Sequence, residues 1–166
     1  MIKNQKGSNH ALPTDGNNLS ALARRRTVLH AAAALLSLLG LADAIYLTIE
    51  HVTGQSVRCT IIAGCSEVLS SSYATIGGFP LAMIGALAYF CVFSLATLAA
   101  FGYRSASLLM RLLVALMFAV TLWLLYLQAF VIGHFCQFCL FSAAITVLLT
   151  AIVVLLWRMG RRSNQF

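Results

Sequence analysis

The stretch His134-Phe135-Cys136-Gln137-Phe138-Cys139 stands at the start of a long apolar run, and it pairs two cysteines at a two-residue spacing. Two thiols at this spacing can close a small disulfide ring or share a metal ion. A helix that begins here places the partial positive charge of its N-terminus beside the sulfurs. The stretch therefore predicts a reactive thiol pair at the mouth of a helix.

A second pair of cysteines, Cys59 and Cys65, lies in the only other polar interval that contains cysteine. The fifth cysteine, Cys91, lies inside an apolar run, where a cysteine usually serves as a small buried apolar side chain. The four thiols in the polar intervals can meet only if the chain folds around a membrane.

The composition indicates an integral membrane protein. Of the 166 residues, 61% are hydrophobic and only 9% are charged, whereas charged residues make up about 25% of a soluble domain. The net charge of +7 does not indicate nucleic-acid binding, because the basic residues stand at the ends of apolar segments and do not form one basic face. The tendency of basic residues to stay on the cytoplasmic side of a membrane accounts for the charge.

Four apolar runs are each long enough for the roughly 20 residues that span a bilayer. The first is longer than the apolar core of a cleaved signal peptide, so we expect it to be retained. The predicted fold is an all-α membrane protein, a four-transmembrane-helix bundle over residues 24–158 with a disordered cytoplasmic tail at 1–23 and a second tail at 159–166. The expected spans are about 27–49, 80–101, 108–132 and 135–157.

The interval 50–79 forms the expected outer loop. Residues 65–69 predict a short surface helix that caps the site, and Gly77-Gly78-Phe79-Pro80 predicts a turn into the second span, with proline tolerated in its first turn. An even number of spans places both termini on one side. Of the 11 Lys and Arg residues only Arg58 falls on the other side, so the termini are expected in the cytoplasm and the four cysteines outside, where disulfides persist.

Three interpretations of the four outer thiols compete. Static disulfides are disfavoured because a bundle of apolar helices needs no such link, and a Cys-x-x-Cys ring is too short to constrain an unfolded chain. A structural zinc site is disfavoured because the five residues between Cys59 and Cys65 fit zinc-ribbon spacing poorly. A thiol-disulfide relay is favoured, because exchange needs an accessible thiolate and a leaving sulfur of low pKa, and the helix N-terminus offers both to Cys136.

Cys139 lies one turn deeper than Cys136, toward the lipid. A sulfur at that depth meets a lipid-dissolved molecule more readily than a soluble protein. Two-electron chemistry between a dithiol and an apolar acceptor in the bilayer indicates a quinone.

Several other side chains are candidates for the quinone pocket. Asp43 falls inside the first span, where a carboxylate usually faces a cavity or a partner, although reaching water at the interface is the alternative. His134 is placed to move protons as the quinone is reduced, or is simply solvated at the membrane surface. The remaining candidates are aromatic or polar side chains near the cysteines: Phe79, Phe135, Phe138, Tyr126 and Gln128.

These features together resemble the bacterial vitamin K epoxide reductase family. The resemblance covers about residues 41–142 and includes the position of Cys-x-x-Cys at the start of the last helix, whereas the other quinone-linked oxidase of the bacterial envelope carries this motif in its first outer loop. The matching segments are Cys59-x5-Cys65, Ser66 to Thr75, Gly78-Phe79-Pro80-Leu81, Gly85 to Tyr89, Tyr126-Leu127-Gln128 and Cys136-Gln137-Phe138-Cys139.

The resemblance implies a role for each cysteine. Cys136 and Cys139 would be the active-site pair, with Cys139 facing the quinone, ubiquinone or menaquinone, and Cys136 exchanging with the loop. Cys59 and Cys65 would be the shuttle pair, with Cys65 nearer Cys136. Many bacterial members carry a fused thioredoxin-like domain. This chain ends at Phe166, so we expect the stand-alone form in the bacterial inner membrane, with a separate extracytoplasmic thioredoxin-fold (DsbA-like) partner.

The chain also departs from the animal members of this family. They have an asparagine early in the second span and a tyrosine four residues after the second active-site cysteine, where this chain has Leu81 and Ala143. The expected function is therefore a quinone-dependent thiol oxidoreductase that supports disulfide formation in exported proteins. Two alternatives stay open: a quinone or epoxide reductase whose product is the quinol, and a non-enzymatic metal-binding or small transport membrane protein.

Overall fold

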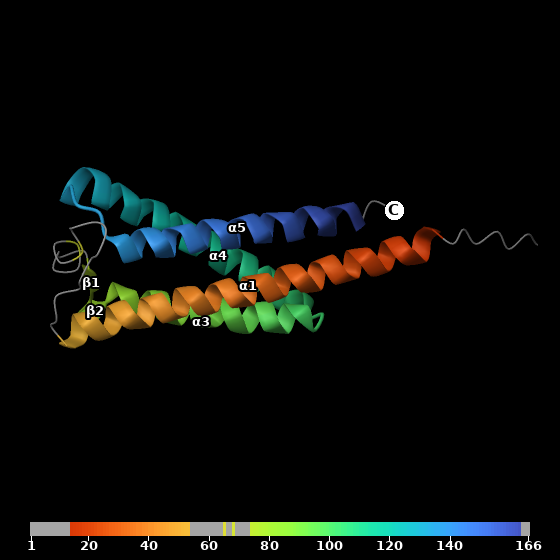
Figure 1. The fold of residues 1–166 in the computed structure, drawn as a ribbon, viewed down its shortest axis with the longest axis horizontal. Coiled ribbons are helices and arrows are strands. Elements are labelled where there is room, and N and C mark those ends of the chain that lie inside the picture. Colours follow the sequence, from red (N-terminus) through yellow and green to blue (C-terminus); the bar gives the residue numbers. More distant parts are fainter. Residues whose placement is uncertain (1–13, 54–64, 66–67, 69–73, 164–166) are drawn as a thin grey trace, which may run out of the picture.

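The computed structural model describes residues 14–53, 65, 68 and 74–163, which form four long helices and a small hairpin (Figure 1). Each of these helices is long and apolar enough to cross a membrane, which confirms the predicted four-span, all-α fold. The elements are α1 (Thr14–Thr53), β1 (Thr75–Ile76), β2 (Phe79–Pro80), α3 (Leu81–Ala100), α4 (Arg104–Tyr126), its continuation as the π-helix η2 (Leu127–Ile132), and α5 (Gln137–Ser163).

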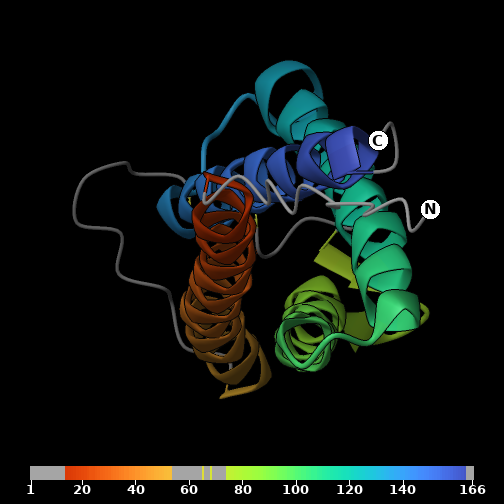
Figure 2. The same ribbon diagram turned by 90° about the vertical axis from the view of Figure 1, so that its right-hand side faces the viewer.

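The helices form a ring in which α1 packs against α3 and α5, and α4 closes the ring between α3 and α5 (Figure 2). The first residues of α1 and the last residues of α5 lie at one end of the bundle, and the hairpin lies at the other (Figure 1). Many large apolar side chains point outward, including Leu116, Trp123 and Phe130, as expected of a surface that faces lipid.

The helices at both ends of the chain extend beyond the expected spans. Helix α1 begins at Thr14, so residues 14–23, expected within a disordered tail, are helical, and α5 continues to Ser163. The segment Leu19–Arg26 is rich in Ala, Leu and Arg, which are strong helix formers. Once the membrane span has nucleated the helix, these residues continue it at little cost. Residues 1–13 lie outside the described part of the chain.

The predicted turn before the second span is a two-residue hairpin. Thr75 pairs with Pro80, and the loop residues Gly77 and Gly78 have φ angles of 59° and 85°. Such tight turns need positive φ, which glycine adopts without steric cost. The hairpin leads directly into α3. The surface helix expected at 65–69 falls largely outside the described residues, although Cys65 and Val68 are both helical.

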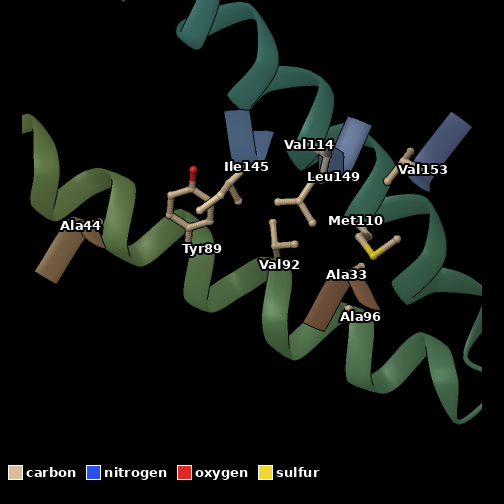
Figure 3. Close-up of a cluster of buried hydrophobic side chains, with 10 residues drawn as sticks. All are labelled: Ala33, Ala44, Tyr89, Val92, Ala96, Met110, Val114, Ile145, Leu149 and Val153. Atoms are coloured by element: carbon tan, nitrogen blue, oxygen red, sulfur yellow. The ribbon is translucent and has the colours of Figure 1, made fainter. Parts of the chain in front are cut away.

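The core combines small side chains such as Ala33 and Ala96 with larger apolar ones such as Met110, and it contains one polar aromatic, Tyr89 (Figure 3). Tyr89 is buried on α3, and its hydroxyl bonds the carbonyl oxygen of Ser142 at 3.0 Å and the hydroxyl oxygens of Ser142 and Thr146 at 2.8 and 3.1 Å. These partners lie on α5, so a buried hydroxyl that needs partners in an apolar medium fixes one helix against another.

At the end of the bundle opposite the hairpin, α1 is joined to α5 by a second polar contact. Arg26 Nη2 donates to the carbonyl oxygen of Met159 at 3.2 Å. A cationic side chain at the C-terminal end of a helix satisfies carbonyl groups that lack an intrahelical partner and interacts favourably with the helix dipole. The two terminal helices are thereby joined beyond the apolar core.

The close approach of α1 to the Tyr89 ring predicts that Gly40→Ala destabilises the bundle. A Cβ at Gly40 would stand 2.5 Å from Tyr89 Cε1, and the ring is held by its hydroxyl bonds and cannot swing away. We expect a loss of about 1–3 kcal/mol, typical of overpacking, measured as a lower thermal midpoint in detergent. Gly160→Ala is the matched control, because its Cβ meets nothing within 4 Å. Equal midpoints for both variants would contradict this packing.

Candidate active site

Cys136 lies immediately before α5, and its carbonyl oxygen accepts the first helical hydrogen bond, from Leu140 N at 3.0 Å. Its side chain is 0% exposed. The sulfur accepts hydrogen bonds from the backbone N–H groups of Phe138 and Cys139 and from the Cys139 thiol. The first N–H groups of a helix have no partner within the helix and readily bind an anion. Two such groups of α5 thus bond this sulfur.

These hydrogen bonds make Cys136 acidic. The bond from the Cys139 thiol, assisted by the two backbone N–H groups, lowers the pKa of Cys136 from 9.0 to about 7, although burial acts in the opposite direction. A substantial share of Cys136 is therefore thiolate near neutral pH. The thiolate is the nucleophile in disulfide exchange.

The buried cysteines of the described chain meet at one place. Cys65 and Cys136 pack with Leu47 in one buried cluster, and Cys139 lies against it. Cys65 is in a disulfide, whereas Cys136 and Cys139 are free thiols. Cys59 lies outside the described residues. The structure therefore brings together three of the four cysteines singled out from the sequence, with an oxidised sulfur beside a reduced pair.

A cavity of about 160 Å³ lies beside Cys139. An engineered apolar cavity of about 150 Å³ holds one benzene molecule, so this space matches a single six-membered ring. On α1 its walls include Asp43, Leu47 and His51, which are four residues apart and so share one helix face. Val68, Ala74 and Pro80 line it from the segment between α1 and α3. The other walls come from residues of α3, α4, η2 and α5, among them Leu81, Gly85, Leu124, Gln128, Cys139 and Ala143.

The two cysteines of the pair differ in what they face. Cys139 lines the cavity, whereas Cys136 is not among the lining residues and packs toward Cys65. One sulfur is therefore directed to a ring-sized apolar space and the other to a disulfide. This arrangement can pass electrons between a disulfide beside Cys136 and a small apolar molecule in the cavity beside Cys139, and the two reactants occupy separate sites.

Few polar groups reach the cavity, and one of them has no partner. The Asp43 Oδ2 atom is buried and makes no hydrogen bond to any residue that the structure describes. His51 reaches the cavity from the same helix face. A carboxyl group left unpaired in an apolar wall is available to a ligand.

Gln128 is the polar group in closest contact with the thiols. It is 3% exposed, and its Oε1 atom accepts the backbone N–H of Cys136 at 3.3 Å. Its amide group also hydrogen-bonds the Cys139 side chain. It lies on η2, and single turns of π-helix inside α-helices are frequent at functional sites.

The other predicted pocket residues do not line the cavity. His134 and Phe135 are exposed in the connection before α5, and Phe79 is exposed on the hairpin. Tyr126 points outward and stacks on Phe130 at 5.1 Å between ring centroids. Phe138 instead contacts Tyr46, with 5.1 Å between the two ring centroids. These aromatic side chains therefore do not form a wall of the cavity, because closeness in sequence to the cysteines does not determine which face of an element a side chain occupies.

Other residues reach the cavity that sequence reasoning did not single out as site residues. His51, assigned to the outer loop, belongs to the last turn of α1, and Tyr89 and Ser142 line the cavity beside their own hydrogen bond. The signal for His51 is its four-residue spacing from Leu47 and eight-residue spacing from Asp43. Leu81 and Ala143, the positions that depart from the animal enzymes, both line the cavity.

The structure offers no metal centre in the part of the chain that it describes. Among those residues no group of three His, Cys, Asp or Glu side chains is placed to hold a metal ion.

The pKa of Cys136 makes the redox pair testable without any substrate. The measurement compares the ultraviolet absorbance of thiolates in the fully reduced wild type and in Cys136→Ala. The part of this absorbance that the variant lacks should titrate with a midpoint near pH 7. Below this pH the sulfur takes up a proton and the absorbance falls. Cys139→Ala removes the thiol that donates to Cys136, so the midpoint should move to higher pH. A midpoint near 9 in both proteins would contradict the described hydrogen bonds.

The fold and the site agree with a comparison of the chain against known protein families. The model of the vitamin K epoxide reductase family matches residues 31–154, which include most of the four helices, the loop with Cys65, and the pair Cys136 and Cys139. This match confirms the resemblance drawn from the cysteine layout. The chain is a membrane oxidoreductase that belongs to the vitamin K epoxide reductase family.

Proposed function

We propose that the protein carries electrons from a reduced thioredoxin-fold partner through Cys59 and Cys65 to Cys136 and Cys139, and from there to a membrane quinone. The net result is a disulfide in the partner, which passes it to exported proteins. The observation that supports this route most directly is the division of the pair, with Cys139 on the cavity and Cys136 against Cys65.

The route balances in electrons and protons. The thiols of Cys136 and Cys139 lose two protons and two electrons and form a disulfide, and the quinone gains both and becomes a quinol. A thiolate of the reduced loop pair then attacks the Cys136 sulfur, and Cys139 leaves as thiolate. Completion of the exchange leaves the loop oxidised and the active-site pair reduced. The loop disulfide then oxidises the dithiol of the partner.

The cavity favours a quinone as the electron acceptor. Its volume suits one ring, and its walls are mostly apolar, as for most small-molecule sites. Because all four helices contribute walls, an isoprenoid tail would leave the cavity between helices toward lipid. Leu81 and Ala143 offer no side-chain hydrogen bond to an epoxide, which favours a quinone over an epoxide as the substrate.

The proposed orientation puts the cysteine end of the bundle outside the cytoplasm. The basic side chains Arg24, Arg25, Arg26, Arg158 and Arg161 all lie toward the opposite end, on the terminal parts of α1 and α5. Basic residues flank spans on the cytoplasmic side. We place the protein in the cytoplasmic membrane of a bacterium, with a DsbA-like partner on the outer side and ubiquinone or menaquinone in the bilayer.

The direct test is quinone reduction by the purified protein in detergent, with a soluble quinone and a reduced thioredoxin-fold protein. The wild type should turn over, and Cys139→Ala should lose turnover because it removes the sulfur on the cavity. Cys91→Ala is the matched control, since Cys91 is a free cysteine on α3 that is not among the cavity-lining residues. Quinone absorbance measures the rate.

The double variant Cys59→Ser, Cys65→Ser tests the shuttle within the same assay. It should stop oxidation of the partner while a small membrane-permeant reductant still supports quinone reduction. Oxidation of the partner at the wild-type rate in this variant would overturn the loop's role. Absence of turnover in the wild type together with one bound zinc per chain would overturn the redox function as a whole.

Asp43 supplies a further prediction. Its unpartnered oxygen beside the cavity is placed to bind the quinone or give it a proton. Asp43→Asn keeps the shape but removes the acid, so quinone reduction should slow and lose part of its pH dependence. Glu50→Gln is the control, because Glu50 is an acid on the same helix that does not line the cavity. An unchanged rate and pH profile in Asp43→Asn would exclude this role.

A further inference from the structure

In the reduced pair the negative charge is on the sulfur of Cys136, whereas the residue that lines the cavity is Cys139. The Cys139 thiol donates to Cys136, so the proton is on Cys139 and the negative charge on Cys136. The sulfur that lines the cavity, however, is Cys139. Because a thiolate is the reactive form, the proton has to pass from Cys139 to Cys136 along their shared hydrogen bond before electrons leave for the quinone.

Gln128 contacts both sulfur-bearing residues and is placed to favour this transfer. Its Oε1 atom accepts the N–H of Cys136, which fixes the amide plane, and the same amide bonds the Cys139 side chain. A thiolate has no proton to donate. Once Cys139 carries the charge, the group of Gln128 that can bond it is therefore the Nε2–H. A hydrogen bond to an ionised group is stronger than one to a neutral group.

The backbone around Gln128 explains how the side chain reaches this position. Gln128 lies on η2, which is followed by Gly133 in the left-handed conformation with a φ of 70°. The side chains of Tyr126 and Phe130 on either side are exposed, whereas Leu127 and Gln128 are buried. An amide buried at this depth needs hydrogen-bond partners, and its partners are the two active-site cysteines.

We propose that Gln128 is a positioning residue that stabilises negative charge on Cys139 and so lets the reduced pair pass its charge from Cys136 to the cavity. The proposal rests on the proposed function and adds to it a group that selects which sulfur reacts with the quinone. Among the residues that the structure describes, the other titratable groups that line the cavity beside the pair are Asp43 and His51 from α1 and Tyr89 from α3.

Two substitutions separate a donor role from a purely structural one. Gln128→Glu keeps an oxygen that accepts the Cys136 N–H but lacks the donor when ionised and adds a negative charge. Gln128→Leu removes both donor and acceptor. Phe130→Leu is the matched control, because Phe130 lies on the same π-helix and is 76% exposed.

The first readout follows quinone reduction by prereduced protein in one turnover, across a range of pH. Both Gln128 variants should react about tenfold more slowly at pH 7, the effect expected from losing a hydrogen bond to a charged group, and their half-maximal rate should move to higher pH. Phe130→Leu should match the wild type. If Gln128→Glu retains the wild-type rate and profile, or only Gln128→Leu is slow, the donor role is wrong.

The second readout needs no quinone, so it separates failure of this inference from failure of the proposed function. In a Cys136→Ala background, thiolate absorbance reports Cys139 directly. Adding Gln128→Leu should move its midpoint upward by about one pH unit, equivalent to a tenfold change in the equilibrium. An unchanged midpoint would overturn the inference even if the wild type reduces quinone. A shifted midpoint would support it even if the electron acceptor is another molecule.

Discussion

Inside a bilayer a hydroxyl group has no water to bond, and Tyr89 finds its partners on α5. The bonds to Ser142 and Thr146 fix the height of α5 relative to α3, and the absence of a side chain at Gly40 lets α1 close over the ring. Ser142 stands one helical turn after Cys139. The same contact that holds three helices together therefore helps to set where Cys139 meets the cavity.

The asymmetry of the thiol pair follows from its place at the start of a helix. Cys136 precedes the first turn and receives the free N–H groups there, whereas Cys139 lies one turn along and faces the interior of the ring. Two chemically identical side chains thereby acquire different acidities and different neighbours. A spacing of two residues is what allows both conditions at once, since it puts one sulfur at the helix mouth and the other beneath it.

The sequence was enough to predict the fold because four apolar runs of sufficient length allow few arrangements. The basic residues at the ends of these runs also predict which ends of the helices lie on the same side of the membrane. The sequence also singled out Cys65, Cys136 and Cys139, since cysteines in polar intervals of a sequence are not expected to serve as apolar filler. It could not predict that Phe79, Phe135 and Tyr126 point away from the cavity, because interfacial aromatics suit lipid and ligand equally. Nor could it predict that a π-turn follows Tyr126, since the hydrophobic pattern there fits an ordinary helix.

The complete burial of Cys136 affects which thiols can react with it. A small soluble thiol that approaches the membrane surface finds no exposed sulfur of the active-site pair to attack at Cys136, which is 0% exposed beneath Leu47 and Cys65. A thiol in water therefore reaches Cys136 only if these packed side chains move. The packing of Leu47 and Cys65 over Cys136 therefore limits which thiols can reach this sulfur.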